Sequence, residues 1–140
     1  MLRVVVDTNV LVSAFIFLGI PGQVIDRSGL DYQLVLTPLT LAELTQVLHR
    51  PKFTSKFGAT VITIESYLSS IRTMATFVRD IEPFPIFRPD PDDAKFLACA
   101  ETVDAAYLVT GDAALLKLKR YHETKILTPR AFLTVLEHNA

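Results

Sequence analysis

The chain has 140 residues, of which half are hydrophobic and 21% are charged, and its formal net charge is −1 at pH 7. This length suits one domain, residues 1–140, and the composition excludes an intrinsically disordered protein. The single cysteine, Cys99, excludes a disulfide-stabilised scaffold and is expected to be a small buried thiol. No apolar run reaches the roughly 20 residues of a membrane helix, and the first residues do not resemble a signal peptide. We therefore expect a soluble, cytoplasmic protein with no membrane partner.

Apolar, strand-like runs alternate with helical patterns along the chain. The expected strands lie at residues 2–6, 33–36, 106–109 and 125–127, and a helix signal follows each of them. This alternation is typical of the α/β class and predicts a three-layer α/β/α fold with a central parallel sheet.

Further helices are expected over residues 10–18, 23–28, 38–50 and 60–79, and another opens at Asp90. Gly19, Pro21 and Gly22 are expected to end the first of these, and the third should end before Pro51. The regular apolar stripe over 60–79 predicts a long helix that packs on the core. Four prolines between residues 81 and 91 exclude a regular helix there.

Asp7 follows the first strand directly. A carboxylate at the end of a buried strand is unfavourable unless it is paired or binds a cation. Aspartate is also a favoured helix cap, so the residue on its own fits both interpretations equally.

Three other acids show the same ambiguity. In Asp90-Pro91-Asp92-Asp93, a cap and two first-turn acids account for the helix start, but Asp93 also lies on the buried helix face of residues 96, 97 and 100. Glu43 lies at the margin of an apolar helix side, where a solvated glutamate is the default. Asp112 follows Gly111 at the end of the strand 106–109 and could be another cap.

The predicted topology places these acids together. In a parallel sheet, the strand ends and the starts of the following helices gather at the carboxyl edge, where such folds bind ligands. Asp7, Glu43, Asp93 and Asp112 are all expected there, and the sequence shows no lysine or arginine partner for them. Because four such carboxylates repel one another, divalent cations are expected, and oxygen ligands suit Mg²⁺ or Mn²⁺. Two such ions can promote phosphodiester hydrolysis without histidine or cysteine.

The motifs that carry these acids resemble the PIN-domain family over essentially the whole chain. They are Val5-Val6-Asp7-Thr8-Asn9-Val10-Leu11, Leu41-Ala42-Glu43-Leu44, Asp90-Pro91-Asp92-Asp93 with Phe96-Leu97-Ala98, and Tyr107-Leu108-Val109-Thr110-Gly111-Asp112, in that order. The resemblance implies an α/β/α fold and a ribonuclease that depends on magnesium or manganese. It extends to the small prokaryotic PIN proteins that are toxins of toxin–antitoxin pairs, which implies an RNA substrate, an antitoxin partner and a homodimer.

The resemblance also implies the site. It assigns the catalytic and metal-binding roles to Asp7, Glu43, Asp93 and Asp112, and it makes Asp112 the weaker or water-mediated ligand. The supporting polar groups that it implies are Asn9, Thr110 and Asp90.

Two basic runs are candidates for contact with the RNA backbone. One comprises Lys117, Lys119, Arg120 and Lys125, with Tyr121 and His122 as neighbours, and the other comprises Arg50, Lys52 and Lys56. A solvated surface is the competing interpretation of both. Four aromatic residues, Phe15, Phe17, Phe53 and Phe57, fit either a dimer interface or the core, and we favour the core.

Two other functions remain open at this point. A phosphohydrolase of the haloacid-dehalogenase kind also has an aspartate after its first strand, but it needs a second acid two residues later, where this chain has Asn9. A PIN-like module that binds nucleic acid or a partner without cleavage is the other alternative, and the intact set of four acids argues against it.

Overall fold

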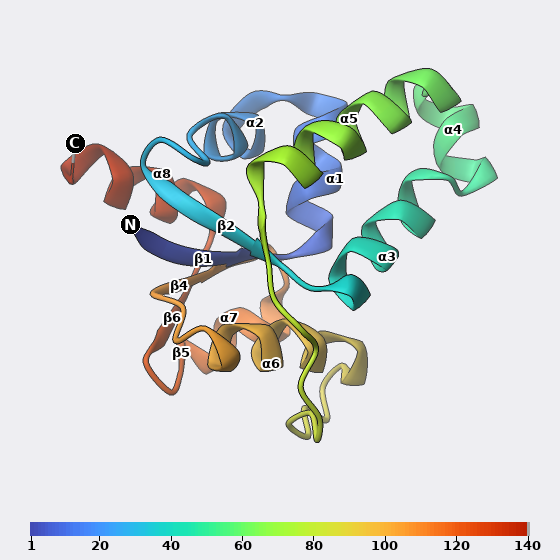
Figure 1. Ribbon diagram of the computed structural model, residues 1–140. Helices are drawn as coiled ribbons and strands as arrows, with labels where there is room; N and C mark the ends of the chain where they lie inside the picture. Colours follow the sequence, from blue (N-terminus) through green and yellow to red (C-terminus); the bar gives the residue numbers. More distant parts are fainter. Residues whose placement is uncertain (140) are drawn as a thin grey trace.

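The computed structural model of the protein describes residues 1–139 and has a six-stranded central sheet. The strands are β1 (Leu2–Val6), β2 (Tyr32–Leu36), β3 (Thr76–Phe77), β4 (Tyr107–Val109), β5 (Arg120–Tyr121) and β6 (Thr124–Leu127), in the order β3-β2-β1-β4-β6-β5 (Figure 1). All neighbouring strands are parallel except β5, which runs antiparallel to β6. The predicted parallel sheet is therefore confirmed, and its strand order reverses between β1 and β4.

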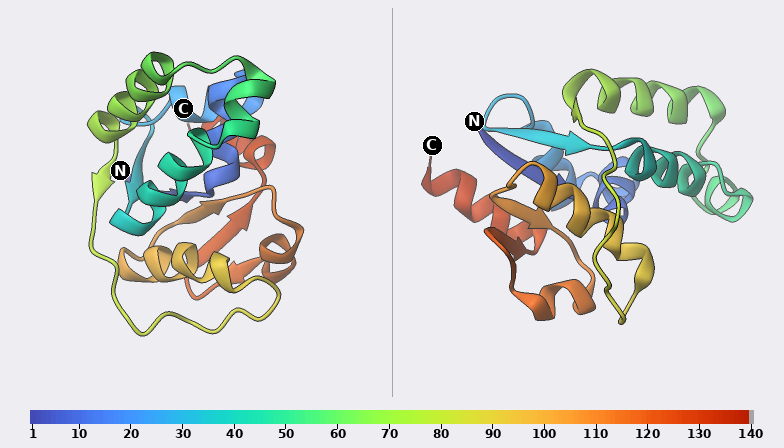
Figure 2. Two further views of the ribbon diagram at one scale, coloured as in Figure 1. Left: turned by 90° about the vertical axis from the view of Figure 1, so that its right-hand side faces the viewer. Right: turned by 60° about the horizontal axis from the view of Figure 1, so that its bottom comes forward.

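Helices cover both faces of this sheet (Figures 1 and 2). One face carries α1 (Thr8–Phe17), α2 (Gly19–Asp26), α3 (Pro38–Leu48), α5 (Val61–Met74) and α8 (Pro129–His138), and the other carries α6 (Ala94–Thr102) and α7 (Ala113–Leu118). The short helix α4 (Pro51–Phe57) joins α3 to α5, and the 3-10 helix η1 (Pro91–Asp93) precedes α6. The three predicted layers are present.

The first strand shows why the sheet lies between two helical layers. Val4 and Val6 point into the core under α1, α2 and α8, whereas Val5 packs with Phe96 of α6 on the opposite face. All three valines are at most 1% exposed. A strand that is buried on both sides needs apolar residues at every position, which is why the run has no polar alternation.

The helix predicted over 60–79 is too long. α5 ends at Met74, and Thr76 then pairs with Val35 as part of the edge strand β3. The backbone N–H of Val78 also donates to the carbonyl of Leu36 at 3.0 Å. Residues 76–78 have side chains that suit a strand, and the free edge of β2 offers them hydrogen-bonding partners that a longer helix would leave unused.

Glycine and proline mark helix starts in this chain as well as helix ends. α1 ends at Phe17 and Leu18 adopts a φ of 57°, so the expected end of the first helix before Gly19 is confirmed. The second helix was expected over 23–28, but α2 already begins at Gly19 and has Pro21 in its first turn, so its predicted start is wrong. Pro51 similarly opens α4, which the sequence did not predict. Proline is tolerated in a first turn because the N–H that it lacks would have no helical acceptor.

The helices of the described residues include none that is individually long and apolar enough to span a membrane. Taken together, α1 and α2 are long and apolar enough for a span, but the chain bends by 107° between them. Cys99 lies on α6 and is 2% exposed in the core, as predicted.

Candidate functional site

Asp7 and Asp112 follow β1 and β4, the two neighbouring strands between which the strand order reverses. Thr110 connects them, because its Oγ1 donates to Asp7 Oδ2 at 2.7 Å and accepts the backbone N–H of Asp112 at 2.9 Å. Asp7 also caps α1 by accepting the N–H of Asn9 on Oδ1 at 3.2 Å. Asp7 is thus a helix cap that also lies at the point of the sheet where α/β folds bind ligands.

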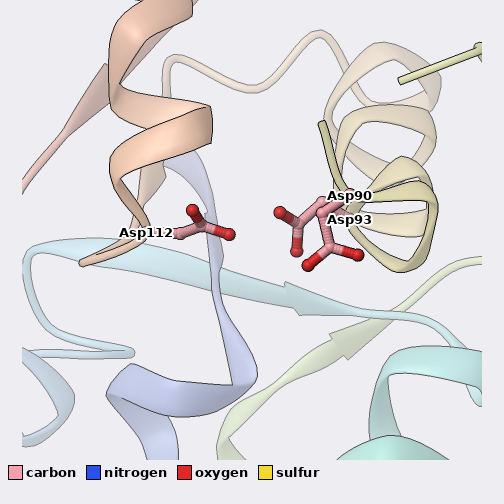
Figure 3. Close-up of side chains that lie close together, drawn as sticks. All are labelled: Asp90, Asp93 and Asp112. Carbon is pink, nitrogen blue, oxygen red and sulfur yellow. The ribbon is translucent and has the colours of Figure 1, made fainter. Parts of the chain in front are cut away.

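Three aspartates from two segments of the chain converge beside this point. Asp90 is the N-cap of η1 and Asp93 is its last residue, and Asp112 faces them from the N-cap of α7 (Figure 3). Each offers a carboxylate oxygen, and these oxygens all lie within 4.8 Å of one another. Asp93 is 6% exposed, and its buried Oδ2 has no hydrogen-bond partner.

These features fit a divalent cation. A buried carboxylate oxygen without a partner is unfavourable unless a cation or a donor satisfies it. The cluster supplies oxygen donors only, which is the ligand chemistry that Mg²⁺ and Mn²⁺ prefer.

A cleft of about 190 Å³ surrounds the cluster. Its lining residues are Asp7, Thr8, Asn9, Glu43, Val47, Arg50, Asp90, Asp92, Asp93 and Asp112. The structure therefore brings together all four predicted acids and two of the supporting residues, Asn9 and Asp90. Thr110 is fully buried behind Asp7. Asp92 also lines the cleft, although the sequence predicted for it only the role of a first-turn acid at the start of a helix.

Glu43 has a cationic partner that the sequence pattern does not reveal. Lys95 Nζ lies 2.5 Å from Glu43 Oε2 and donates to the backbone carbonyl of Asp92 at 2.6 Å. The Lys95 side chain is 13% exposed and that of Glu43 is 29% exposed. The expectation that no lysine or arginine neutralises these acids is therefore wrong for Glu43. The spacing of Lys95 three residues after Asp92 indicates only that the lysine lies near the start of its own helix, and it gives no signal for the contact with Glu43.

Three carboxyl groups of the site, those of Asp7, Asp93 and Asp112, have shifted pKa values. Burial, followed by hydrogen bonding and repulsion from Asp112, raises the pKa of Asp93 to about 8. The pKa of Asp112 is lowered, chiefly by its hydrogen bond with Asp93. Burial also raises the pKa of Asp7, and the Thr110 hydroxyl partly opposes this. In the absence of a cation, the Asp93 and Asp112 pair thus retains a proton near neutral pH.

This proton predicts how the stability of the metal-free protein depends on pH. Between about pH 4 and pH 8, folded Asp93 holds a proton that the unfolded chain has lost, so the free energy of unfolding decreases as the pH rises. We expect the melting temperature in chelator to fall by about 3 °C or more from pH 5 to pH 8 on this account. Differential scanning calorimetry of wild type and Asp93→Asn, whose amide does not titrate, measures this contribution as a difference. Parallel pH profiles for the two proteins would contradict the assignment.

Thr110 offers a second prediction, because its hydroxyl holds Asp7 and Asp112 in register. Thr110→Val keeps the shape of the side chain but removes both hydrogen bonds, whereas Thr110→Ser keeps the hydroxyl. We expect the valine variant to lower divalent-metal affinity about 10- to 100-fold, the usual effect of removing a group that orients a ligand. Isothermal titration with Mn²⁺ measures this affinity, and the serine variant should stay within a few-fold of wild type. If Thr110→Val and wild type bind Mn²⁺ with equal affinity, the Thr110 hydroxyl stabilises the fold but does not orient the metal ligands.

The first predicted RNA-contact run lies elsewhere. Lys125 pairs with Tyr107 at the start of β4, and Arg120 pairs with Lys125 across the β5–β6 hairpin. These residues are therefore towards the amino end of the sheet, opposite the end that carries Thr110. Lys117 lies in the last turn of α7 and Lys119 is the C-cap of that helix, and neither residue lines the acidic cleft. Of the second run, Arg50 does line the cleft.

Comparisons with known proteins agree with this architecture. The fold is similar to that of VapBC2 from Rickettsia felis bound to a DNA fragment from their promoter, with 15% identity, a TM-score of 0.61 and coverage of 89% of this chain and 96% of that chain. It is also similar to PAE2754 from Pyrobaculum aerophilum, with 17% identity, a TM-score of 0.60 and coverage of 98% and 90%. Among curated proteins, none matches the chain. The sequence profile of the PIN domain matches residues 3–114, so the chain belongs to the PIN-domain family.

Proposed function

We propose that this protein is a metal-dependent endoribonuclease that hydrolyses phosphodiester bonds in RNA. The observation that carries the proposal is the cluster of Asp90, Asp93 and Asp112, whose carboxylate oxygens lie within 4.8 Å of one another and include a buried oxygen without a partner. Membership of the PIN-domain family supports a nuclease, and the absence of cysteine and histidine from the cleft lining agrees with metal-assisted hydrolysis.

In this proposal, Asp90, Asp93 and Asp112 hold a Mg²⁺ or Mn²⁺ ion, and Asp7 and Glu43 complete the acidic site. When bound, such ions supply an activated water and stabilise the leaving oxygen of a phosphodiester. Thr110 fixes the orientation of Asp7, and Asn9 presents a polar side chain at the cleft. Asp93 loses its proton when it becomes a ligand, so metal binding is expected to strengthen as the pH rises towards 8.

One assay tests the proposal against its alternatives. The purified protein is incubated with single-stranded RNA and with a phosphomonoester, in Mn²⁺ or in chelator, beside an Asp7→Asn variant. We expect RNA cleavage that requires Mn²⁺ and Asp7. Cleavage that survives chelation or the Asp7 change would contradict the metal mechanism. Turnover of the phosphomonoester alone would indicate a phosphohydrolase, and RNA binding without cleavage would indicate a non-catalytic PIN-like module.

We further propose that the protein is the toxin of a cytoplasmic toxin–antitoxin pair. The resemblance to small prokaryotic PIN toxins and the fold shared with VapBC2 of Rickettsia felis support this role. An antitoxin that occupies the acidic cleft would silence the nuclease. Co-expression with the product of a short neighbouring reading frame tests the proposal, since a true antitoxin should co-purify with this chain and suppress Mn²⁺-dependent cleavage.

A homodimer is part of the same proposal. Phe15 and Phe53 are half-buried and stack on each other with centroids 6.4 Å apart, which supports their interpretation as core residues. Phe17 and Phe57 are 66% and 38% exposed and form an edge-on pair, so that interpretation is wrong for them. Exposed aromatic rings of this kind are enriched in protein interfaces. Light scattering on the purified chain reports its oligomeric state directly.

A further inference from the structure

The acidic cleft presents an electrostatic difficulty for the substrate that we propose. Six of its ten lining residues are aspartate or glutamate, and an RNA backbone carries a negative charge on every phosphate. Bound cations would neutralise the centre of the cleft but not the approach to it. Arg50 is the one lysine or arginine that lines the cleft within the described residues. Among the residues that line the cleft, Arg50 is therefore the only one that attracts an incoming RNA backbone.

Arg50 belongs to a segment with a strong charge bias. Residues 44–64 contain no aspartate or glutamate, but they carry His49, Arg50, Lys52 and Lys56. His49 pairs with Glu65 at 3.2 Å, whereas the other three cations form no ion pair with any residue in 1–139. We call Arg50, Lys52 and Lys56 the basic arm.

The geometry of the basic arm suits a linear polyanion. Arg50 is the N-cap of α4, and Lys52 and Lys56 lie on that helix at positions i and i+4. This spacing puts them on one helix face, about 6 Å apart along the axis. Figure 1 and the right-hand view of Figure 2 show α4 at the outer end of α3 and α5. All three side chains are exposed, so like charges on the arm repel one another without compensation from the protein.

We infer that the basic arm binds the phosphate backbone of the RNA and directs the strand into the cleft at Arg50. This inference rests on the proposed ribonuclease function and adds the surface that holds the substrate. Arg50 contacts the phosphate nearest the acidic site, and Lys52 and Lys56 contact phosphates farther along the strand. The run at Lys117, Lys119 and Arg120 has no part in this contact, because β5 and β6 carry it towards the amino end of the sheet.

Two matched triple variants test the inference. One replaces Arg50, Lys52 and Lys56 by alanine, and the other replaces Lys117, Lys119 and Arg120 by alanine, so both remove three positive charges from exposed positions. Fluorescence anisotropy with a labelled, unstructured RNA of about 16 nucleotides, in chelator to prevent cleavage, measures binding against salt concentration. Three lost phosphate contacts should make the slope of log K against log salt shallower by about 2 and weaken binding about 100-fold at 0.1 M salt.

We expect this loss in the basic-arm variant and less than a threefold change in the other. Equal losses in the two variants, or a larger loss in the Lys117, Lys119 and Arg120 variant, would overturn the inference. Displacement of the RNA by polyglutamate at equal charge concentration would also overturn it, because the arm would then be a site for acidic proteins. Circular dichroism melts confirm that both variants fold.

The same proteins separate failure of the inference from failure of the proposed function. If wild type and the basic-arm variant cleave RNA equally well in Mn²⁺ at subsaturating RNA, the arm assignment is wrong and the ribonuclease stands. If wild type binds RNA through the arm but does not cleave it in Mn²⁺, the arm stands and the proposed activity is wrong.

Discussion

Asp93→Asn is expected to weaken divalent-metal binding strongly and to slow RNA cleavage about 1000-fold, while it raises the thermal stability of the metal-free protein at pH 8. Asparagine has nearly the shape of a protonated aspartic acid, which is the form that burial favours at this position. The substitution therefore relieves charge repulsion with Asp112 and Asp90. It also removes the anionic oxygen that would bind a cation. Without the cation, the reaction would lose about 4 kcal/mol of transition-state stabilisation, which corresponds to about a 1000-fold lower rate.

The neighbouring Asp92 supplies a matched control. It lies in the same short helix and lines the same cleft, but it is exposed and is not a member of the three-aspartate cluster. Asp92→Asn should leave Mn²⁺ affinity within about threefold of wild type, as expected for a surface charge. Isothermal titration and single-turnover cleavage measure both variants. A stabilised Asp93→Asn protein that still cleaves RNA would exclude Asp93 from the site, and equal losses in the two variants would make the effect one of general charge.

Lys95→Met should act in the opposite direction on the metal. Lys95 is a fixed positive charge beside Glu43, so it occupies a carboxylate that could otherwise face a cation. Its removal leaves the cleft with one more uncompensated negative charge, and we expect Mn²⁺ affinity to rise about tenfold. The metal-free protein should lose about 1 to 2 kcal/mol of stability, because Glu43 and the Asp92 carbonyl lose a charged hydrogen-bond donor.

Calorimetry of metal-free protein and Mn²⁺ titration measure these two effects separately. Lys119→Met, a substitution of an exposed lysine outside the cleft, serves as the control and should change neither quantity appreciably. If Mn²⁺ affinity falls in Lys95→Met, the lysine positions Glu43 for the metal and does not compete with it.

The sheet and the placement of the acids could be predicted because both follow from local patterns. Buried strands such as Leu2–Val6 need uninterrupted apolar residues, and the parallel topology then fixes where Asp7 and Asp112 must lie. The position of Asp93 on a buried helix face was also visible, and Asp93, Phe96 and Leu97 are all buried.

The errors concern features that depend on contacts between distant segments. Lys95 meets Glu43 only because α3 and α6 pack together, and no periodicity in either helix encodes that pairing. The position of the basic run after Asp112 relative to the cleft could not be predicted either, because it depends on the two-residue strand β5, which is too short to be recognised in a sequence. This strand turns the chain back towards the amino end of the sheet. Tertiary packing likewise converts the end of the predicted long helix into β3.

Asp7, Asp90 and Asp112 each cap the helix that follows them, with one carboxylate oxygen bound to a backbone N–H. Asparagine caps a helix about as well as aspartate does. A change from aspartate to asparagine at these positions would therefore remove an anionic ligand at little cost to the fold. If the proposed function holds, one such substitution would remove the nuclease activity and keep the scaffold, so a stable RNA- or partner-binding module lies one substitution away from the proposed enzyme.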